Sequence, residues 1–218
     1  MMAADARFWD DIAEKYAAKP VENVPAYHRK LEITKARLRR DQTLLDVGCG
    51  TGSLALELAP HVEHVHAVDI SGEMIRIARQ RADAANARNV TFHQTSLDAL
   101  PPFEPGAFDG VCAYNILHLV DDRAGKLKAL YELLAPGGFL ISSTVCLGDS
   151  YKPYGLILTV MRWLGRAPKV HIVRGEALMA EMRDAGFVDV AAHEVGAAEI
   201  TSFVVARKPL EVESIREA

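Results

Sequence analysis

The sequence predicts a single α/β domain whose sheet is mainly parallel. Short apolar runs alternate with segments of helical periodicity along most of the chain, an order typical of βαβ units. Glycines at positions 48, 50 and 52 follow the first apolar run, where open α/β sheets place a ligand-binding turn. Only residues 196–198 separate the last two runs, so these two are expected to form an antiparallel hairpin.

The apolar runs define a sheet of seven expected strands. They are residues 43–47, 64–70, 89–94, 108–114, 139–147, 187–195 and 199–208. The helices expected among them are residues 53–59, a segment that opens at Ser71, residues 122–134 and residues 175–185. Because strands and helices alternate, we expect helices on both faces of the sheet.

Local signals set the ends of these helices. The Ser71 side chain can cap a first turn, and Glu73 lies where a carboxylate favours the helix dipole. Apolar residues at i, i+3, i+4 and i+7 give the next helix one apolar face: Leu127, Leu130, Tyr131 and Leu134. That helix is expected to stop at the Pro-Gly-Gly of residues 136–138, and the last helix at Gly186.

Composition excludes several classes of function. The 218-residue chain has a formal net charge of −4, so it lacks the basic field of nucleic-acid binders. Its three cysteines are widely spaced, which argues against a disulfide framework or a zinc site. The first residues do not resemble a signal peptide, and the longest apolar stretch, residues 154–165, is shorter than the ~20 residues of a membrane span. A cytoplasmic protein is expected.

The glycine turn has an acidic partner in the second strand. Asp69 ends that strand, where a carboxylate can accept hydrogen bonds from both hydroxyls of a ribose. The alternative is a turn that only packs a strand against a helix. An NAD-dependent oxidoreductase is disfavoured, because the spacing is G-x-G-x-G and Ser53 stands where the dinucleotide fingerprint has its last small residue.

Five segments occur in the order of a known family. They are LLDVGCGTGSLALELA from residue 44, AVDISGEMIRIAR from 67, VTFHQTSLDALP from 90, FDGVCAYNILHLVDD from 108 and LLAPGGFLISS from 133. Together they resemble class I S-adenosylmethionine-dependent methyltransferases over residues 44–143. The resemblance implies one Rossmann-like domain over residues 1–218, with these parts: a helical cap (1–40), a cofactor-binding core (41–148), a lid or acceptor-site insertion (149–173) and a C-terminal helix and hairpin (174–218).

The resemblance implies S-adenosylmethionine as cofactor, S-adenosylhomocysteine as product and no metal. The glycine turn would pass the methionine moiety, Asp69 would bind the ribose, and Ile70 and Met74 would flank the adenine. The implied cofactor contacts are Tyr16, Asp46, Gly48, Cys49, Gly50, Gly52, Asp69, Ile70, Met74, Ser96, Leu97 and Asn115. Ser96 departs from the family, which often has an acidic residue there for the adenine amino group; its hydroxyl or the backbone near Leu97 would replace it.

The methyl acceptor is less constrained than the cofactor. The fourth motif reads AYNILH and lacks the Asn/Asp-Pro-Pro-Tyr/Phe tetrapeptide of enzymes that methylate adenine or glutamine nitrogens. The resemblance therefore implies a small, apolar acceptor, with quinone precursors, sterols and phospholipid amines among the substrates of similar enzymes. The expected acceptor pocket contains Tyr27, Tyr114, His118, Tyr154, Met161 and His171. His118 is either a general base or a packed side chain.

Rival functions stay open at this point. One is a phospholipid-amine N-methyltransferase at a membrane surface, and another is a protein that binds S-adenosylmethionine without turnover. Residues 1–40 are expected to fold over the cofactor, although Phe8, Trp9, Ile12 and Tyr16 also fit one apolar helix face. Either a monomer or a homodimer fits the sequence.

The insertion at residues 149–173 has two interpretations. One helical face gathers Leu156, Ile157, Val160, Met161 and Leu164, and the basic residues around it are Lys152, Arg162, Arg166 and Lys169. We expect a lid helix packed on the sheet. The alternative is weak contact of residues 152–169 with an anionic membrane surface.

Overall fold

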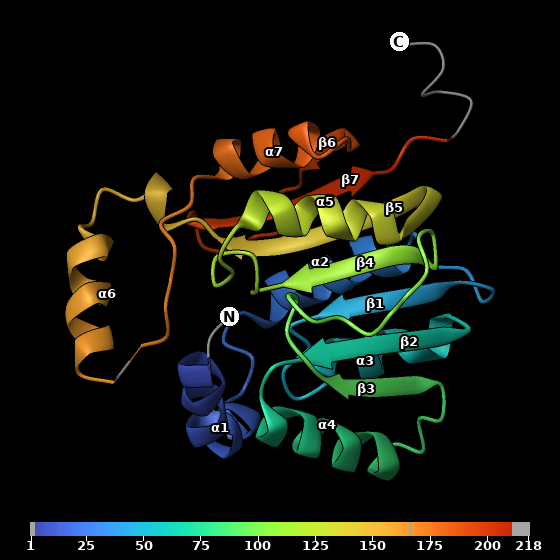
Figure 1. Ribbon diagram of the computed structural model, residues 1–218, viewed down its shortest axis with the longest axis horizontal. Helices are drawn as coiled ribbons and strands as arrows, with labels where there is room; N and C mark the ends of the chain where they lie inside the picture. Colours follow the sequence, from blue (N-terminus) through green and yellow to red (C-terminus); the bar gives the residue numbers. More distant parts are fainter. Residues whose placement is uncertain (1–2, 166, 211–218) are drawn as a thin grey trace.

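The computed structural model describes residues 3–165 and 167–210 and contains one sheet of seven strands (Figure 1). The strands are β1 (Thr43–Val47), β2 (His64–Asp69), β3 (Val90–Gln94), β4 (Phe108–Tyr114), β5 (Leu134–Val145), β6 (Val188–Ala192) and β7 (Thr201–Arg207). Their order is β3-β2-β1-β4-β5-β7-β6, and β7 is antiparallel to both neighbours whereas all other pairs are parallel. This confirms the predicted mainly parallel sheet and its C-terminal hairpin.

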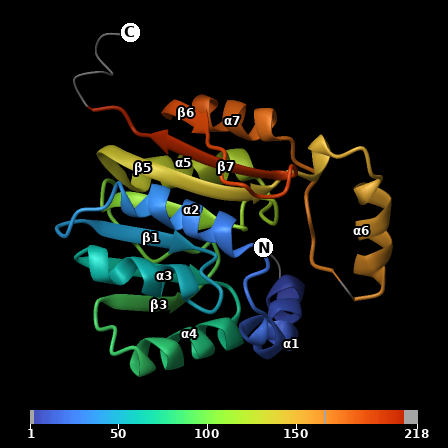
Figure 2. The same ribbon diagram turned by 180° about the vertical axis from the view of Figure 1, so that it is seen from behind.

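Helices cover both faces of the sheet, as predicted. They are α1 (Ala3–Ala18), α2 (Val24–Lys35), α3 (Ser53–Leu58), α4 (Gly72–Ala84), α5 (Arg123–Leu133), α6 (Tyr154–Trp163) and α7 (Gly175–Asp184), with short 3-10 turns at Ala59–His61 and Leu147–Asp149. One apolar core joins α5 and α7 to one face, and a second joins α2, α3 and α4 to the other (Figures 1 and 2). None of the helices in the described part is long and apolar enough to cross a membrane.

The chain between α5 and β5 differs from the sequence prediction. The helix ends at Leu133 and the strand begins at Leu134, so the Pro-Gly-Gly segment lies inside the strand rather than ahead of it. The pairing of β4 with β5 slips between Phe108 and Gly110, and a proline without an N–H is tolerated where the ladder is interrupted. The two C-terminal strands are shorter than predicted, because the link between them spans residues 193–200.

The strand order places a crevice beside β1. β1 pairs with β2 on one side and with β4 on the other. The connection that follows β1 therefore runs to one side of this strand, and the connection from β3 to β4 runs to its other side. Such a switch in strand order is where open α/β sheets bind ligands. The glycine turn at the end of β1 therefore lies at the expected position for a site.

Helix α6 stands apart from the rest of the molecule. None of its residues is buried, and both ribbon views show it beyond the carboxyl ends of the strands, separate from the sheet (Figures 1 and 2). The expectation of a lid helix packed on the sheet is therefore wrong for α6. The later part of the insertion does approach the core, since Ala167 and Val173 are buried.

Two glycine-to-alanine substitutions test how tightly the sheet is packed, because one glycine is crowded by its neighbours and the other is not. A Cβ on Gly110 in β4 would lie 2.3 Å from the Phe139 ring, whereas one on Gly155 in α6 meets no atom within 4 Å. We expect Gly110→Ala to lower the free energy of unfolding by about 1–3 kcal/mol through overpacking. Gly155→Ala should leave it unchanged or raise it slightly, since alanine favours helix. Urea titrations of both variants test this, and equal stability would contradict the packing argument.

Candidate active site

A cavity of about 290 Å³ lies at the carboxyl ends of β1, β2 and β4. Its lining comes from α1, the glycine turn, the end of β2, α4, the segment after β4 and the insertion. The residues are Trp9, Tyr16, Gly48, Gly50, Asp69, Ile70, Met74, Tyr114, Asn115, Ile116, His118, Leu119, Val145, Pro168 and Val170. The cavity is polar beside β2 and apolar towards the insertion.

The three glycines of the turn have different roles. All have positive φ, which only glycine adopts without strain. A Cβ on Gly48 would lie 2.8 Å from Ile116, and one on Gly52 would lie 3.0 Å from Ala78, so packing requires glycine at both positions. A Cβ on Gly50 would meet only Tyr16, at 3.8 Å, which leaves its backbone open to a ligand in the cavity.

Asp69 organises the polar end of the cavity. Its two carboxylate oxygens accept hydrogen bonds from the backbone N–H groups of Gly50 and Ser71, each at 2.9 Å. Ser71 caps α4, as predicted, by accepting the N–H of Met74. A carboxylate accepts about four hydrogen bonds, so Asp69 keeps capacity for a further donor from a ligand. A ligand that carries two adjacent hydroxyls matches this arrangement.

Helix α1 closes one side of the cavity and is tied at its middle and near its C-terminal end. Asp10, at the middle, accepts hydrogen bonds from the Ser71 hydroxyl at 2.6 Å and from the N–H of Glu73 at 3.1 Å. Near the C-terminal end, Arg81 donates to the carbonyl of Ala17 at 2.8 Å and to the Thr51 hydroxyl at 2.7 Å. The predicted N-terminal cap therefore shares its anchors with the glycine turn and the start of α4.

Three carboxylates gather around this end of the cavity. Asp46 is only 2% exposed, and burial, followed by the charge of Asp69, raises its pKa to about 7. Its Oδ2 has no hydrogen-bond partner. Burial also raises the pKa of Asp69, and the charge of Asp10 adds to that rise. No described Lys or Arg forms an ion pair with any of the three, so the region favours a positively charged ligand group.

A second cavity of about 700 Å³ adjoins the first and shares Tyr16, Tyr114 and Asn115 with it. Asn115 has a φ of 57°, a left-handed conformation that asparagine tolerates, and its N–H donates to the carbonyl of Ser143 at 2.6 Å. Lys30 also lines this cavity, and its ammonium donates to the Ser143 hydroxyl at 2.8 Å. No described carboxylate pairs with Lys30, and burial lowers its pKa.

His118 is buried at the apolar side of the first cavity. It is 8% exposed, and its Nδ1 has no hydrogen-bond partner. Burial, with a smaller contribution from the charge of Arg123, lowers its pKa to about 4. The ring is therefore neutral near pH 7, and with so low a pKa it is a weak proton acceptor.

The cavity brings together many of the residues expected to bind the cofactor. Those that line it are Tyr16, Gly48, Gly50, Asp69, Ile70, Met74 and Asn115. The other expected contacts lie outside the lining: Asp46, Cys49, Gly52, Ser96 and Leu97. The Ser96 hydroxyl accepts the N–H of Asp98, a bond within its own turn.

The expected acceptor residues divide into two groups. Tyr114 and His118 line the first cavity, and Tyr27 lines the second. Tyr154 lies in a separate hollow with Arg123, Met161 is exposed on α6, and His171 bonds to Asp121 at 2.9 Å. These last three do not line either cavity, because Tyr154 and Met161 lie on α6, which stands away from the sheet, and His171 bonds to Asp121 instead.

Sequence reasoning missed several lining residues. Lys30 gave no signal, because a lysine on an amphipathic helix is normally solvated. Ile116, Leu119, Val145, Pro168 and Val170 form the apolar wall. The apolar composition after β4 suggested core, but nothing in the sequence showed which side chains face a cavity.

The buried carboxyl of Asp46 predicts a pH-dependent stability. Its folded-state pKa, about 7, lies above its ordinary value of 3.8, so the fold favours the protonated form. The contribution of this protonated carboxyl to the free energy of unfolding is complete below about pH 4 and is lost as the pH rises through about 7. The wild type should therefore lose unfolding free energy between pH 5 and pH 8, whereas Asp46→Asn lacks this loss. We expect the difference in unfolding free energy between Asp46→Asn and wild type to rise by about 1–3 kcal/mol over this range.

The measurement is the free energy of urea unfolding for both proteins at these two pH values. The matched control is Asp41→Asn, because Asp41 is an exposed carboxylate that pairs with Arg39 at the surface. An identical pH slope for wild type and Asp46→Asn would show that Asp46 has an ordinary pKa.

Comparison with known proteins identifies relatives of the chain. A family model described as a methyltransferase domain matches residues 44–138. The chain is 30% identical to the ubiquinone/menaquinone biosynthesis C-methyltransferase UbiE of Coxiella burnetii, over 75% of this chain and 73% of that protein. It is 36% identical to the ubiquinone biosynthesis O-methyltransferase of Albidiferax ferrireducens, over 48% of this chain and 41% of that protein. The chain spans about half the length of such O-methyltransferases, between 41% and 58%.

Solved structures share the fold at low identity. The [4+2]-cyclase SpnF has a TM-score of 0.74 at 20% identity and covers 94% of this chain and 95% of its own. A Haemonchus contortus phosphoethanolamine N-methyltransferase 2, in complex with phosphomonomethylethanolamine and S-adenosylhomocysteine, has a TM-score of 0.75 at 18% identity, over 96% of this chain and 61% of that chain. These likenesses establish the architecture alone.

Proposed function

This chain belongs to the class I S-adenosylmethionine-dependent methyltransferases, and on that premise we propose that it transfers a methyl group to a small, apolar acceptor. The observation that carries the proposal is the group of Asp10, Asp46 and Asp69 beside an open glycine turn, without a paired cation. S-Adenosylmethionine has a cationic sulfur, which this environment attracts.

The residues around the first cavity fit this cofactor. Asp69 has free lone pairs for the two ribose hydroxyls, and the open backbone of Gly50 would border the methionine moiety. Ile70 and Met74 supply an apolar surface for the adenine on the same side of the cavity. A dinucleotide fits poorly, because its pyrophosphate would lie against the same carboxylates.

When bound, the cofactor supplies a methyl group that is already activated for attack by a nucleophile. The protein then has to align the acceptor and exclude water, which accounts for much of the rate of such transfers. Tyr16, Tyr114 and Asn115, which border both cavities, would hold the acceptor against the cofactor. His118 stays neutral and would serve as a wall or a hydrogen-bond partner rather than a strong base.

The apolar wall supports an acceptor with a large apolar part. Ile116, Leu119, Val145, Pro168 and Val170 surround that end of the cavity, and the ubiquinone methyltransferase relatives are named for quinone biosynthesis. A quinone precursor or a compound of similar polarity fits this surface.

The proposal also covers where the protein acts and in what form. It includes peripheral contact of residues 152–169 with a membrane and action in the cytoplasm. The working unit is either a monomer or a homodimer.

The first test is methyl transfer itself. We expect label from methyl-labelled S-adenosylmethionine, mixed with protein and bacterial extract, to enter the organic phase on solvent partition. Asp69→Ala should abolish most of this transfer and weaken S-adenosylhomocysteine binding by about 1–3 kcal/mol, because two charged hydrogen bonds are lost.

The matched control for Asp69→Ala is Asp83→Ala, an exposed carboxylate at the far end of α4. Label in the aqueous phase alone would replace the apolar acceptor with a polar one. Cofactor binding without transfer to any fraction would contradict catalysis and favour a binding protein. Such an outcome is meaningful, since a cyclase has the same fold.

A second test uses the charge of the sulfur. Asp46 has a pKa of about 7, and its ionised form should attract the sulfonium of S-adenosylmethionine but not the neutral thioether of the product. The affinity for S-adenosylmethionine should therefore rise by about 3- to 10-fold between pH 6 and pH 8, and that for S-adenosylhomocysteine much less. Calorimetry on wild type and Asp46→Asn measures this. An equal pH dependence for both ligands, or one that persists in Asp46→Asn, would rule out the assigned role.

A further inference from the structure

Helix α6 has a continuous apolar face that the described chain leaves uncovered. The large apolar residues of this face, with their exposed fractions, are Leu156 (70%), Ile157 (43%), Val160 (48%), Met161 (37%), Trp163 (84%) and the C-cap residue Leu164 (52%). At 100° per residue they fall within an arc of about 160°. Only Tyr154 and Leu158 are half-buried against the rest of the protein. Contiguous exposed apolar surface of this kind is typical of an interaction site.

The charge around this face is one-sided. Residues 150–174 contain no Asp or Glu, and their charged residues are Lys152, Arg162, Arg166, Lys169 and Arg174, although the whole chain has a formal net charge of −4. Lys152 and Arg162 are exposed, and no described carboxylate pairs with either. Lys169 pairs with Asp121, and Arg166 lies outside the described residues. The segment is thus a local positive region on a negative protein.

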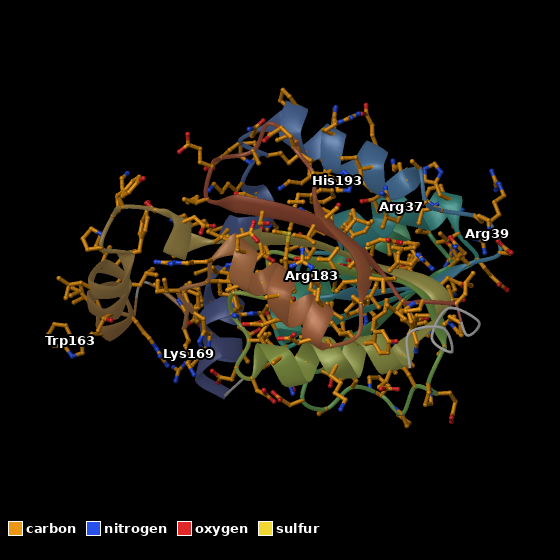
Figure 3. The ribbon with its side chains drawn as sticks, turned by 90° about the horizontal axis from the view of Figure 1, so that it is seen from above. Arg37, Arg39, Trp163, Lys169, Arg183 and His193 are labelled. Carbon is orange, nitrogen blue, oxygen red and sulfur yellow. The ribbon has the colours of Figure 1, made fainter. Side chains whose placement is uncertain are left out.

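Two aromatic side chains of the segment, those of Tyr151 and Trp163, point outward. Figure 3 shows Trp163 at the outer side of α6, away from the sheet, and Lys169 between α6 and the body of the protein. Tyr151, just ahead of the helix, is fully exposed. Tryptophan and tyrosine concentrate at the boundary between water and hydrocarbon, where an apolar ring and a polar atom are both accommodated.

The position of α6 connects this face with the candidate active site. The helix stands beyond the carboxyl ends of the parallel strands (Figures 1 and 2), the ends at which the residues of the first cavity lie. Pro168 and Val170, a few residues after the helix, line that cavity. A surface bound by α6 would therefore lie near the apolar wall where the acceptor is expected.

We infer that α6 docks this protein on a bilayer rich in anionic lipid, with its apolar face in the interface and Lys152 and Arg162 at the headgroups. This inference rests on the proposed function and specifies it, because the acceptor would then enter the cavity from the membrane. Self-association through α6 is disfavoured by symmetry. A two-fold dimer places the same patch against itself and would bring these cations together without a carboxylate between them.

Vesicle binding tests this directly. The 218-residue protein is sedimented with vesicles of phosphatidylcholine, alone or mixed with phosphatidylglycerol, at low and high salt. We expect binding to the anionic vesicles only, weakened by salt, and a loss of about tenfold in Leu156→Ser/Trp163→Ser or in Lys152→Gln/Arg162→Gln. The matched control is Val24→Ser, since Val24 is 47% exposed but lies on α2.

Calorimetry with S-adenosylhomocysteine on the same preparations keeps the two proposals apart. Unchanged cofactor binding in the α6 variants shows that they are folded and leaves the vesicle result to decide the docking role. The inference is overturned if the wild type ignores anionic vesicles, if the α6 variants bind as well as Val24→Ser, or if light scattering shows a dimer that only the α6 variants lose. If the wild type does not bind S-adenosylhomocysteine, that result contradicts the proposed function instead.

Discussion

The carboxylate of Asp69 is the interaction on which the geometry of the site depends. Through the N–H of Gly50 it fixes the turn after β1, and through the N–H of Ser71 it fixes the start of α4. Ser71 in turn bonds to Asp10, which holds α1 against α4. One side chain at the end of β2 thus orients the turn, the next helix and the N-terminal cap around a common cavity. Its own charge, together with that of Asp46, then sets the preference of that cavity for a cation.

Much of this arrangement could be predicted because it depends on local chemistry. The glycine turn, the serine cap of α4 and the acidic end of β2 are all visible as residue types at fixed spacing. The parallel sheet follows from the alternation of apolar runs with helices. These signals fail where a tertiary contact decides the outcome, as at β5, which starts at Leu134 because the strand continues the ladder beside Phe108 in spite of Pro136.

The rest of the site depended on which side chains face a cavity, and sequence patterns do not carry that information. Lys30 lies on a helix whose period indicates a solvated face, yet its ammonium reaches the Ser143 hydroxyl beneath the second cavity. Conversely, Met161 and Tyr154 were expected near the acceptor because the insertion follows β5. The helix that carries them stands off the sheet, so its apolar face could not be assigned to a core from periodicity alone.

The two anchors of α1 have a consequence for turnover. Trp9 and Tyr16 form part of the cavity wall, so a shift of this helix would change the shape of the cofactor site. The bonds from Asp10 to Ser71 and from Arg81 to Ala17 hold it in place. A ligand whose exit required α1 to move would therefore stay bound longer than its direct contacts alone dictate.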